Sequence, residues 1–355
     1  ERPAGSLAAA EGVFRIFVYD LPQPVLQRLP FGSDPDPIFN TYSNFMRALL
    51  ADPDALAQTA DEAQLFFAPA LGTNMEGLLE YYEHTVHHIS ARFPYWGRRG
   101  GSDHFWWNSG DGAGCNLNEM GATRRSIGVA HYFKFNTTDP DCGVRTKDVG
   151  VPPHVPPLAS QSFLQAGLHE AHRRPLRFFF AGNVPDAEAV PTMPDEALEA
   201  EAYSEGVRQL VWKHLRPQTH PTAWGGGATA RIVQRSSTYL TDWTDAQFCL
   251  APQGVGWGVR LAWAIVGGCV PILAESAVSP WFDDILDYDS FALRGVPKRA
   301  LRQLPEILDN VSAATLGALQ RSLWRHRRLF LWPPAGWAPP ATLRTARLLP
   351  PPDPT

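Results

Sequence analysis

Residues 246–273 read AQFCLAPQGVGWGVRLAWAIVGGCVPIL and contain the most informative pattern of the chain. The apolar run at 246–252 predicts a buried strand, and the glycine-rich stretch at 254–258 predicts a turn. The segment 259–266 predicts a helix ended by two glycines, and the apolar run at 269–273 predicts the next strand. A strand, a helix and a second strand in this order are typical of an α/β domain with a parallel sheet.

The glycine-rich turn is also the strongest candidate for a binding site. In open α/β sheets, ligands bind beyond the carboxyl ends of the strands. Glycines let the backbone approach a phosphate, the following helix offers free N–H groups, and Arg260 near its first turn would add a charge-assisted contact. The spacing matches neither the dinucleotide fingerprint nor the Walker A loop. Two interpretations stay open here, a nucleotide-phosphate site and an ordinary tight turn.

The remainder of the chain shows two successive α/β patterns. They are separated by PPHVPP at 152–157, which cannot be helical. The fold class is therefore α/β, with two Rossmann-like domains facing across a cleft. We expect an N-terminal domain at 12–157 and a C-terminal domain at 158–335. The flanking segments, 1–11 and the proline-rich 336–355, are expected to be a disordered stem remnant and tail.

Individual elements follow from the same patterns. Strands are predicted at 13–19, 63–69 (stopped by Pro69), 127–135, 148–153, 176–183 and 291–293. Helices are predicted at 44–51, from 52–54 onward, and at 77–93, 203–215, 281–286 and 301–330. The segment 100–118 mixes Gly, Ser, Asp, His and Asn with two adjacent tryptophans and predicts a polar loop, where binding sites are often built.

Composition excludes several classes of function. The net charge of the 355 residues is −5, whereas nucleic-acid-binding proteins usually carry a basic excess. No apolar run reaches the about 18 residues that a membrane span needs, and residues 1–11 lack a signal-peptide pattern. Both a cytosolic protein and a form without its anchor fit this. Twelve tryptophans are many for this length and serve either as large core residues or, in a few cases, as sugar-binding surfaces.

The four cysteines show no CxxC spacing, so a zinc site is not expected. Cys249 and Cys269 sit in apolar runs and are predicted to be buried thiols. Cys115 and Cys142 lie in polar sequence and form either a disulfide or two free thiols. Two sequons, at Asn136 and Asn310, are compatible with glycosylation in a secretory compartment.

Several short motifs occur in an order that resembles the exostosin-like glycosyltransferases, glycosyltransferase family 47, of the plant and algal type. Together they cover about residues 13–295. They are VYDLP at 18–22, FFAPA at 66–70, DHF at 103–105, KDVGVP at 147–152, RFFFAG at 177–182, GVR at 206–208, FCLAPQG at 248–254, GCVPI at 268–272 and PWFDDIL at 280–286.

The resemblance implies a GT-B fold and an inverting transfer from a UDP-sugar to a polysaccharide or glycoprotein glycan, with no metal and no cofactor. It implies that the donor binds mainly to the C-terminal domain. The residues expected there are Arg177, Gly182, Arg208, Pro252, Gln253, Gly254, Gly256, Arg260 and Glu275. The expected partners are the two substrates and a homologous transferase subunit. The expected location is the Golgi lumen, as a type II membrane protein with its anchor outside this chain.

An inverting transfer needs a base that takes the proton of the acceptor hydroxyl. Asp103 and His104 are the candidates, because they lie in the polar segment at 100–118. In the same segment, Trp106, Trp107 and Asn108 are expected to bind the acceptor.

One departure from the family pattern concerns the donor site. Many members have Glu in the place of Trp263 and Arg in the place of Gln253. The glutamate is expected to hold the nucleotide ribose, and an indole cannot accept those hydrogen bonds. Glu275 is the candidate substitute. Two hypotheses follow, an active transferase and a non-catalytic partner or glycan-binding protein of the same fold. A nucleotide-sugar epimerase is disfavoured, because no dinucleotide fingerprint is present.

Overall fold

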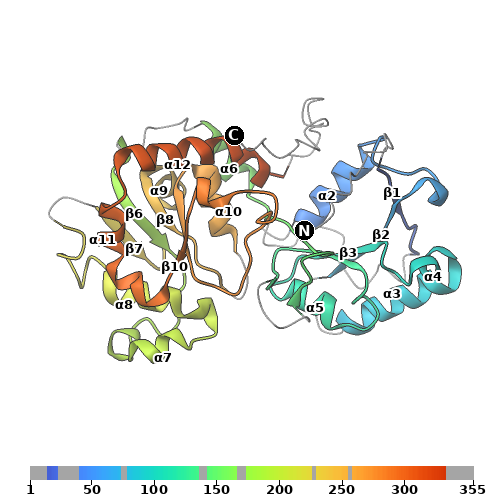
Figure 1. The fold of residues 1–355 in the computed structure, drawn as a ribbon, viewed down its shortest axis with the longest axis horizontal. Helices are drawn as coiled ribbons and strands as arrows, with labels where there is room; N and C mark the ends of the chain where they lie inside the picture. Colours follow the sequence, from blue (N-terminus) through green and yellow to red (C-terminus); the bar gives the residue numbers. More distant parts are fainter. Residues whose placement is uncertain are drawn as a thin grey trace, which may run out of the picture.

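Two parallel five-stranded sheets form the framework of the chain (Figure 1). The computed structural model describes residues 14–22, 40–72, 78–135, 142–165, 173–225, 229–254 and 258–332. The segments 1–11 and 336–355, for which disorder was predicted, lie outside these ranges. No helix within the described ranges has the length and apolar character required to cross a membrane.

The N-terminal sheet has the strand order β1-β2-β3-β4-β5. Its strands are β1 (Ile16–Val18), β2 (Leu65–Gly72), β3 (His104–Asn108), β4 (Ile127–Ala130) and β5 (Val149–Gly150). Its helices are α2 (Thr41–Leu50), α3 (Leu78–Arg92), α4 (Tyr95–Arg99) and α5 (Ala113–Glu119). Alternation along the strands divides the core, because Phe66 and Trp106 pack with α3 whereas Phe67 and Trp107 pack with α2.

Some local predictions for this unit were wrong. The segment 100–118 contains β3, a central strand whose five side chains are all buried, because both of its faces are covered by helices. Residues 52–54 form a turn and not a helix start. Pro69 does not stop β2, which continues through it to Gly72. The pairing of β2 with β3 shifts register between Phe67 and Leu71, and this irregularity accommodates the missing N–H of the proline.

The C-terminal sheet has the order β10-β9-β8-β6-β7. Its strands are β6 (Leu176–Ala181), β7 (Ala230–Val233), β8 (Ala246–Leu250), β9 (Val270–Ala274) and β10 (Leu293–Val296). The chain therefore starts in the interior of the sheet and winds outward in both directions. The reversal lies between β6 and β8, and such a switch point is where doubly wound sheets bind ligands.

Helices cover both faces of this sheet (Figure 1). One face packs with α6 (Pro157–Gln165), α9 (Tyr239–Asp245) and α10 (Val259–Gly267), and the other with α7 (Asp195–Glu199), α8 (Val207–Leu215) and α11 (Leu304–Asp309). The long α12 (Ala313–His326) contributes to both cores. Phe178 and Phe180 point to the α8 side and Phe179 to the α9 side, as the period of a strand requires. The sequence patterns did not predict β7 and α9, and residues 281–286 form a turn instead of the predicted helix.

Two disulfides join cysteines that are distant in the sequence. Cys115 on α5 is bonded to Cys142, which precedes β5. Cys249 on β8 is bonded to Cys269, directly before β9. The predicted burial of Cys249 and Cys269 was confirmed. Their disulfide was not predicted, and it forms because the parallel pairing of β8 with β9 brings the two side chains to the same face of the sheet.

The two units contact each other through specific polar groups. The indole Nε1 of Trp281 donates to His131 O at 2.8 Å, and the backbone N–H of Ser279 donates to Phe133 O at 3.1 Å. Arg145 forms a two-point ion pair with Asp283, at 2.9 and 3.2 Å. These contacts place the carboxyl end of β4 against the loop that follows β9.

Candidate active site

The carboxyl ends of β6 and β8 carry two arginines side by side. Arg260, in the first turn of α10, donates from Nε to Ala181 O at 2.8 Å. Its guanidinium lies over Gly182, where an added Cβ would come within 2.7 Å of Arg260 Nη2. Gly182 is thus required for the position of Arg260, and both predicted donor residues lie at the switch point.

Arg208, near the start of α8, is the second arginine and is only 1% exposed. Its Nε and Nη2 donate to Gln253 O at 3.1 and 2.9 Å, and its Nη1 donates to Asn183 O and to the hydroxyl of Tyr203. Burial and the nearby positive charge of Arg260 lower the pKa of Arg208 to about 10. Within the described ranges neither arginine has a carboxylate at ion-pair distance, and both donate to backbone carbonyls at the switch point.

A turn at 203–206 precedes α8 in place of the predicted helical residues. Ser204, Glu205 and Gly206 have φ of 60°, 48° and 77°, in the left-handed region. Gly206 has no alternative, because a Cβ there would lie 1.8 Å from Leu198 O. For the serine and the glutamate, this backbone conformation costs free energy, and such residues cluster at functional sites.

The turn is attached to the loops that follow β8 and β9. The backbone N–H of Ser204 donates to Gly254 O at 3.1 Å. Glu205 Oε1 accepts from Ser276 Oγ at 3.2 Å and from the Ala277 N–H at 3.4 Å. The buried Ser204 Oγ and Gln253 Oε1 have no hydrogen-bond partner within the described part of the chain. Unpaired buried polar atoms in native proteins usually have a ligand or water as partner.

Two aromatic side chains, from α9 and α10, border the site. Tyr239, at the start of α9, is 5.0 Å from Trp263 of α10 between ring centroids. Burial raises the pKa of Tyr239, and the charges of Arg260 and Arg208 oppose that shift. Tyr239 and Trp263 together form what we call the aromatic wall, and Trp263 stands in it at the position where a carboxylate was expected.

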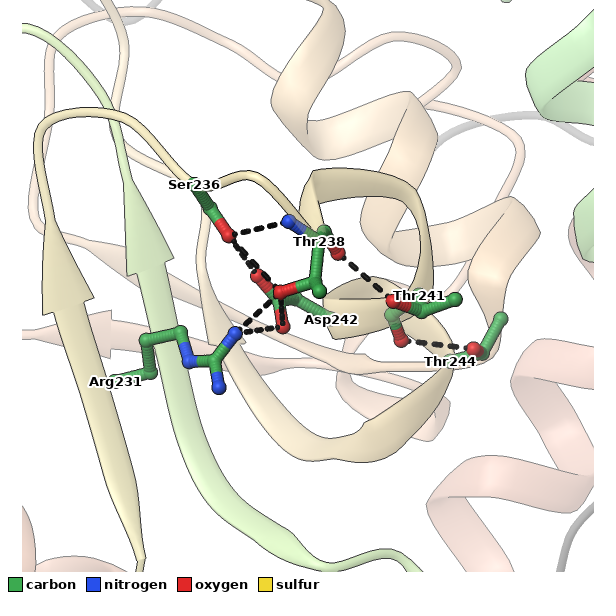
Figure 2. Close-up of polar contacts among 6 residues, drawn as sticks. All are labelled: Arg231, Ser236, Thr238, Thr241, Asp242 and Thr244. Atoms are coloured by element: carbon green, nitrogen blue, oxygen red, sulfur yellow. Dashed lines mark hydrogen bonds and ion pairs between the residues drawn. The ribbon is translucent and has the colours of Figure 1, made fainter.

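A network of hydrogen bonds around Asp242 fixes α9 (Figure 2). The carboxylate, 2% exposed, accepts from Arg231 Nη1 at 2.6 Å, Ser236 Oγ at 2.5 Å and Thr238 Oγ1 at 3.0 Å. Thr238 is also the N-cap residue of α9. The network ties Arg231 of β7 and the loop after this strand to α9, of which Tyr239 is the first residue.

The other predicted donor residues are placed as follows. Pro252, Gln253 and Gly254 follow β8 beside Arg208, and Gly256 lies outside the described residues. Glu275 is exposed after β9. Arg177 is near the start of β6, at the amino ends of the strands and away from the arginine pair. It donates to Gln247 Oε1 and Leu308 O. It is not brought together with Arg208 and Arg260.

Asp103 and His104 lie at the amino end of β3. The N-terminal unit, however, contacts the C-terminal unit through the carboxyl end of β4, at the opposite ends of its strands. His104 is fully buried and pairs with Asp103 Oδ1 at 2.8 Å and with the Tyr19 hydroxyl at 2.7 Å. Burial would raise the pKa of Asp103, but hydrogen bonds from Arg98 and His104 lower it, and burial lowers the pKa of His104. The geometry gives both residues a structural role and does not support catalysis by them.

The predicted acceptor residues are also in β3. Trp106 and Trp107 point to opposite faces of the sheet and are 0% and 2% exposed, so they do not form a surface for a sugar chain. Asn108 is at the carboxyl end of β3 and accepts from the Gly110 N–H at 2.8 Å. The predicted acceptor surface at Trp106 and Trp107 is therefore wrong, because both faces of β3 are buried.

A buried polar cluster that the sequence did not predict lies at the carboxyl ends of β3 and β4. His131 Nδ1 pairs with Val151 O at 2.9 Å, and its Nε2 contacts Thr41 Oγ1 at 3.2 Å. The Thr41 hydroxyl also lies 3.5 Å from Ser109 Oγ. Burial lowers the pKa of His131 to about 4. Its only signal in the sequence was a histidine inside the strand predicted at 127–135, which in the structure ends at Ala130.

Of the two sequons, the one at Asn310 follows α11 and is exposed, whereas Asn136 lies outside the described residues.

Known proteins resemble this chain over most of its length. The model of the Exostosin GT47 domain matches residues 10–311. The chain is 26% identical over 331 residues to a probable glucuronoxylan glucuronosyltransferase of Arabidopsis thaliana, covering 87% of this chain and 66% of that protein. It is 26% identical over 340 residues to a probable beta-1,4-xylosyltransferase of the same plant, covering 88% and 75%. A probable glucuronosyltransferase of Oryza sativa subsp. japonica is 26% identical over 347 residues, covering 91% and 76%.

Among solved structures, the apo structure of OtsA aligns with a TM-score of 0.38 and 10% identity, covering 95% of this chain and all (100%) of that one. TarM aligns with a TM-score of 0.31 and 8% identity, covering 77% and 58%. The two Rossmann-like units of the GT-B fold are evident from the sheets themselves. The family match agrees with the resemblance carried by the nine sequence motifs: the chain belongs to the exostosin GT47 family of glycosyltransferases.

Proposed function

We propose that this chain transfers a sugar from a UDP-sugar to a polysaccharide, with inversion and without a metal ion. The observation that carries the proposal is the Arg208–Arg260 pair at the switch point of the C-terminal sheet. A diphosphate leaving group develops negative charge as the glycosidic bond to it breaks. Fixed cations at that position stabilise the transition state because they need no reorganisation during the reaction.

The nucleoside would lie on the aromatic side of the arginines, against Tyr239 and Trp263. Stacking of a base on aromatic rings is worth about 1–3 kcal/mol, enough to replace part of what a ribose-binding carboxylate would supply. The relatives' names support xylan or a similar cell-wall polysaccharide as acceptor. Asp103 and His104 are unsuited as the base because of their burial at the amino end of β3.

The expected location is a secretory compartment, the Golgi lumen. Two disulfides support an oxidising environment, and Asn310 offers an exposed sequon. Trp263 in the position of the expected glutamate favours the second candidate function, a non-catalytic partner that binds glycans. The two candidates differ in whether UDP binds.

Calorimetry with UDP, combined with UDP release from a panel of UDP-sugars in the presence of xylan oligosaccharides, tests the proposal. UDP binding is expected, and Arg260→Ala should weaken it roughly tenfold or more, because hydrogen bonds to charged groups are strong. Arg302→Ala, at an exposed position of the C-terminal unit, is the matched control. Absence of UDP binding and of release from every donor, with retained glycan binding, would establish the non-catalytic function instead.

A further inference from the structure

The carboxylate of Glu205 is held on the β9 side of the arginine pair. Its Oε1 is anchored on Ser276 and Ala277, in the loop after β9. Tyr239 begins α9, which packs against β6 and β8, so the Tyr239 end of the aromatic wall lies toward β6, on the other side of β8 from that loop. A sugar nucleotide whose diphosphate is held between these groups has its base at one end and its sugar at the other. With the base on the aromatic wall, the sugar falls beside Glu205.

Glu205 also borders the N-terminal unit. Its anchors Ser276 and Ala277 directly precede the segment in which the backbone N–H of Ser279 donates to Phe133 O at 3.1 Å, and the charge of Glu205 contributes to the raised pKa of the neighbouring Tyr132. Tyr132 follows β4, at the edge of the sheet that contacts the C-terminal unit. The carboxylate therefore lies where the donor sugar must meet an acceptor held by the other unit.

The backbone at Glu205 is costly for a residue with a side chain. Its φ of 48° is in the left-handed region, which glycine occupies without strain. The hydrogen bonds that Oε1 accepts from Ser276 and Ala277 offset part of this cost. The second carboxylate oxygen takes no part in them. This oxygen, Oε2, lies 3.8 Å from Lys298 Nζ, beyond hydrogen-bond distance, and retains capacity to accept hydrogen bonds.

We propose that Glu205 holds hydroxyl groups of the donor's sugar ring, and that its charge makes the site prefer a neutral sugar over a uronic acid. The inference rests on the proposed function. An ionised carboxylate only accepts hydrogen bonds, so it matches the O–H groups of a pentose or hexose. A uronic acid brings a second carboxylate to the same place. Lys298 already faces Glu205, so removing the Glu205 charge would free the ammonium for that uronate.

The test is calorimetry on the full chain with three probes: UDP, UDP-xylose and UDP-glucuronate. The wild type should bind UDP-xylose more tightly than UDP-glucuronate. Glu205→Gln should leave UDP affinity unchanged, weaken UDP-xylose roughly tenfold, and narrow or reverse the difference from UDP-glucuronate. Glu196→Gln, at an exposed position of α7, is the matched control and should change none of the three affinities.

A second variant separates the role of the carboxylate from that of the fold. Glu205→Gly suits the positive φ but loses the hydrogen bonds to Ser276 and Ala277, so its unfolding temperature should change little while it shows the same loss of sugar affinity. Unchanged UDP-xylose affinity in both variants, with normal UDP binding, overturns this assignment alone. An equal loss for UDP and the UDP-sugars places Glu205 on the nucleoside and also overturns it. A wild-type chain that does not bind UDP overturns the proposed function together with it.

Discussion

Arg260 lies over Gly182, with its Nη2 2.7 Å from where a Cβ would be. This contact links the first turn of α10 to the end of β6, two elements that are far apart in the sequence but adjacent at the switch point. The arginine can reach Ala181 O only because residue 182 has no side chain. Its position therefore depends on a glycine that contributes no chemistry of its own.

Gly182→Ala is expected to displace Arg260 and weaken UDP binding roughly tenfold, because a charge-assisted contact to the diphosphate is lost. The flexible end of the arginine can move, so the temperature of unfolding should change little. Calorimetry with UDP and a thermal melt check both expectations. Gly97→Ala, where nothing lies within 4 Å of the added Cβ, is the control. Full UDP affinity in Gly182→Ala would contradict the assigned role of Arg260.

The sequence predicted this part of the site because its signals are local. The strand, glycine turn and helix at 246–267 appear in order, and Arg260 follows directly from their spacing. The turn at Ser204 and Glu205 could not be predicted, since neither residue favours a left-handed backbone and tertiary contacts impose it. The strand β3 was missed because its flanking residues are polar, although both its faces are covered.

Asp103→Asn is expected to destabilise the fold by about 1–3 kcal/mol, because it weakens buried hydrogen bonds with Arg98 and His104. The kcat of the folded fraction should be unchanged. Denaturant unfolding and UDP release measured on the same preparation test this. Asp61→Asn, at an exposed position, serves as control. A lower kcat with an unchanged free energy of unfolding would instead indicate that Asp103 is the catalytic base.

Acidification is expected to destabilise the fold through His131. Its pKa is about 4 in the folded chain, against 6.5 ordinarily, because burial disfavours the charged ring. Between these values the unfolded chain binds a proton that the folded chain does not, so stability falls as pH falls from 6.5 toward 4. The loss from this one group approaches about 3 kcal/mol.

Denaturant unfolding across this pH range measures the effect. His131→Asn should reduce the slope of stability against pH, whereas the exposed His220→Asn should leave it unchanged. Equal slopes in the wild type and in His131→Asn would contradict the depressed pKa.

Trp263→Ala is expected to weaken UDP binding roughly tenfold, since it removes one face of the aromatic wall. Binding of inorganic pyrophosphate should be unchanged, because that ligand has no base to stack. Arg260→Ala should weaken both ligands, so the two variants separate contacts to the nucleoside from contacts to the diphosphate. Trp263→Phe should retain most of the UDP affinity.

Trp263→Glu supplies the residue type that many family members have at this position. It is nevertheless expected to bind UDP no better than Trp263→Ala and to unfold more easily. The indole is packed among Phe163, Tyr239 and Trp243, and a carboxylate there would be desolvated without a donor. Thermal melts and calorimetry on both variants measure this. UDP binding above that of the wild type in Trp263→Glu would show that the site still holds the ribose through a carboxylate, and would exclude aromatic replacement.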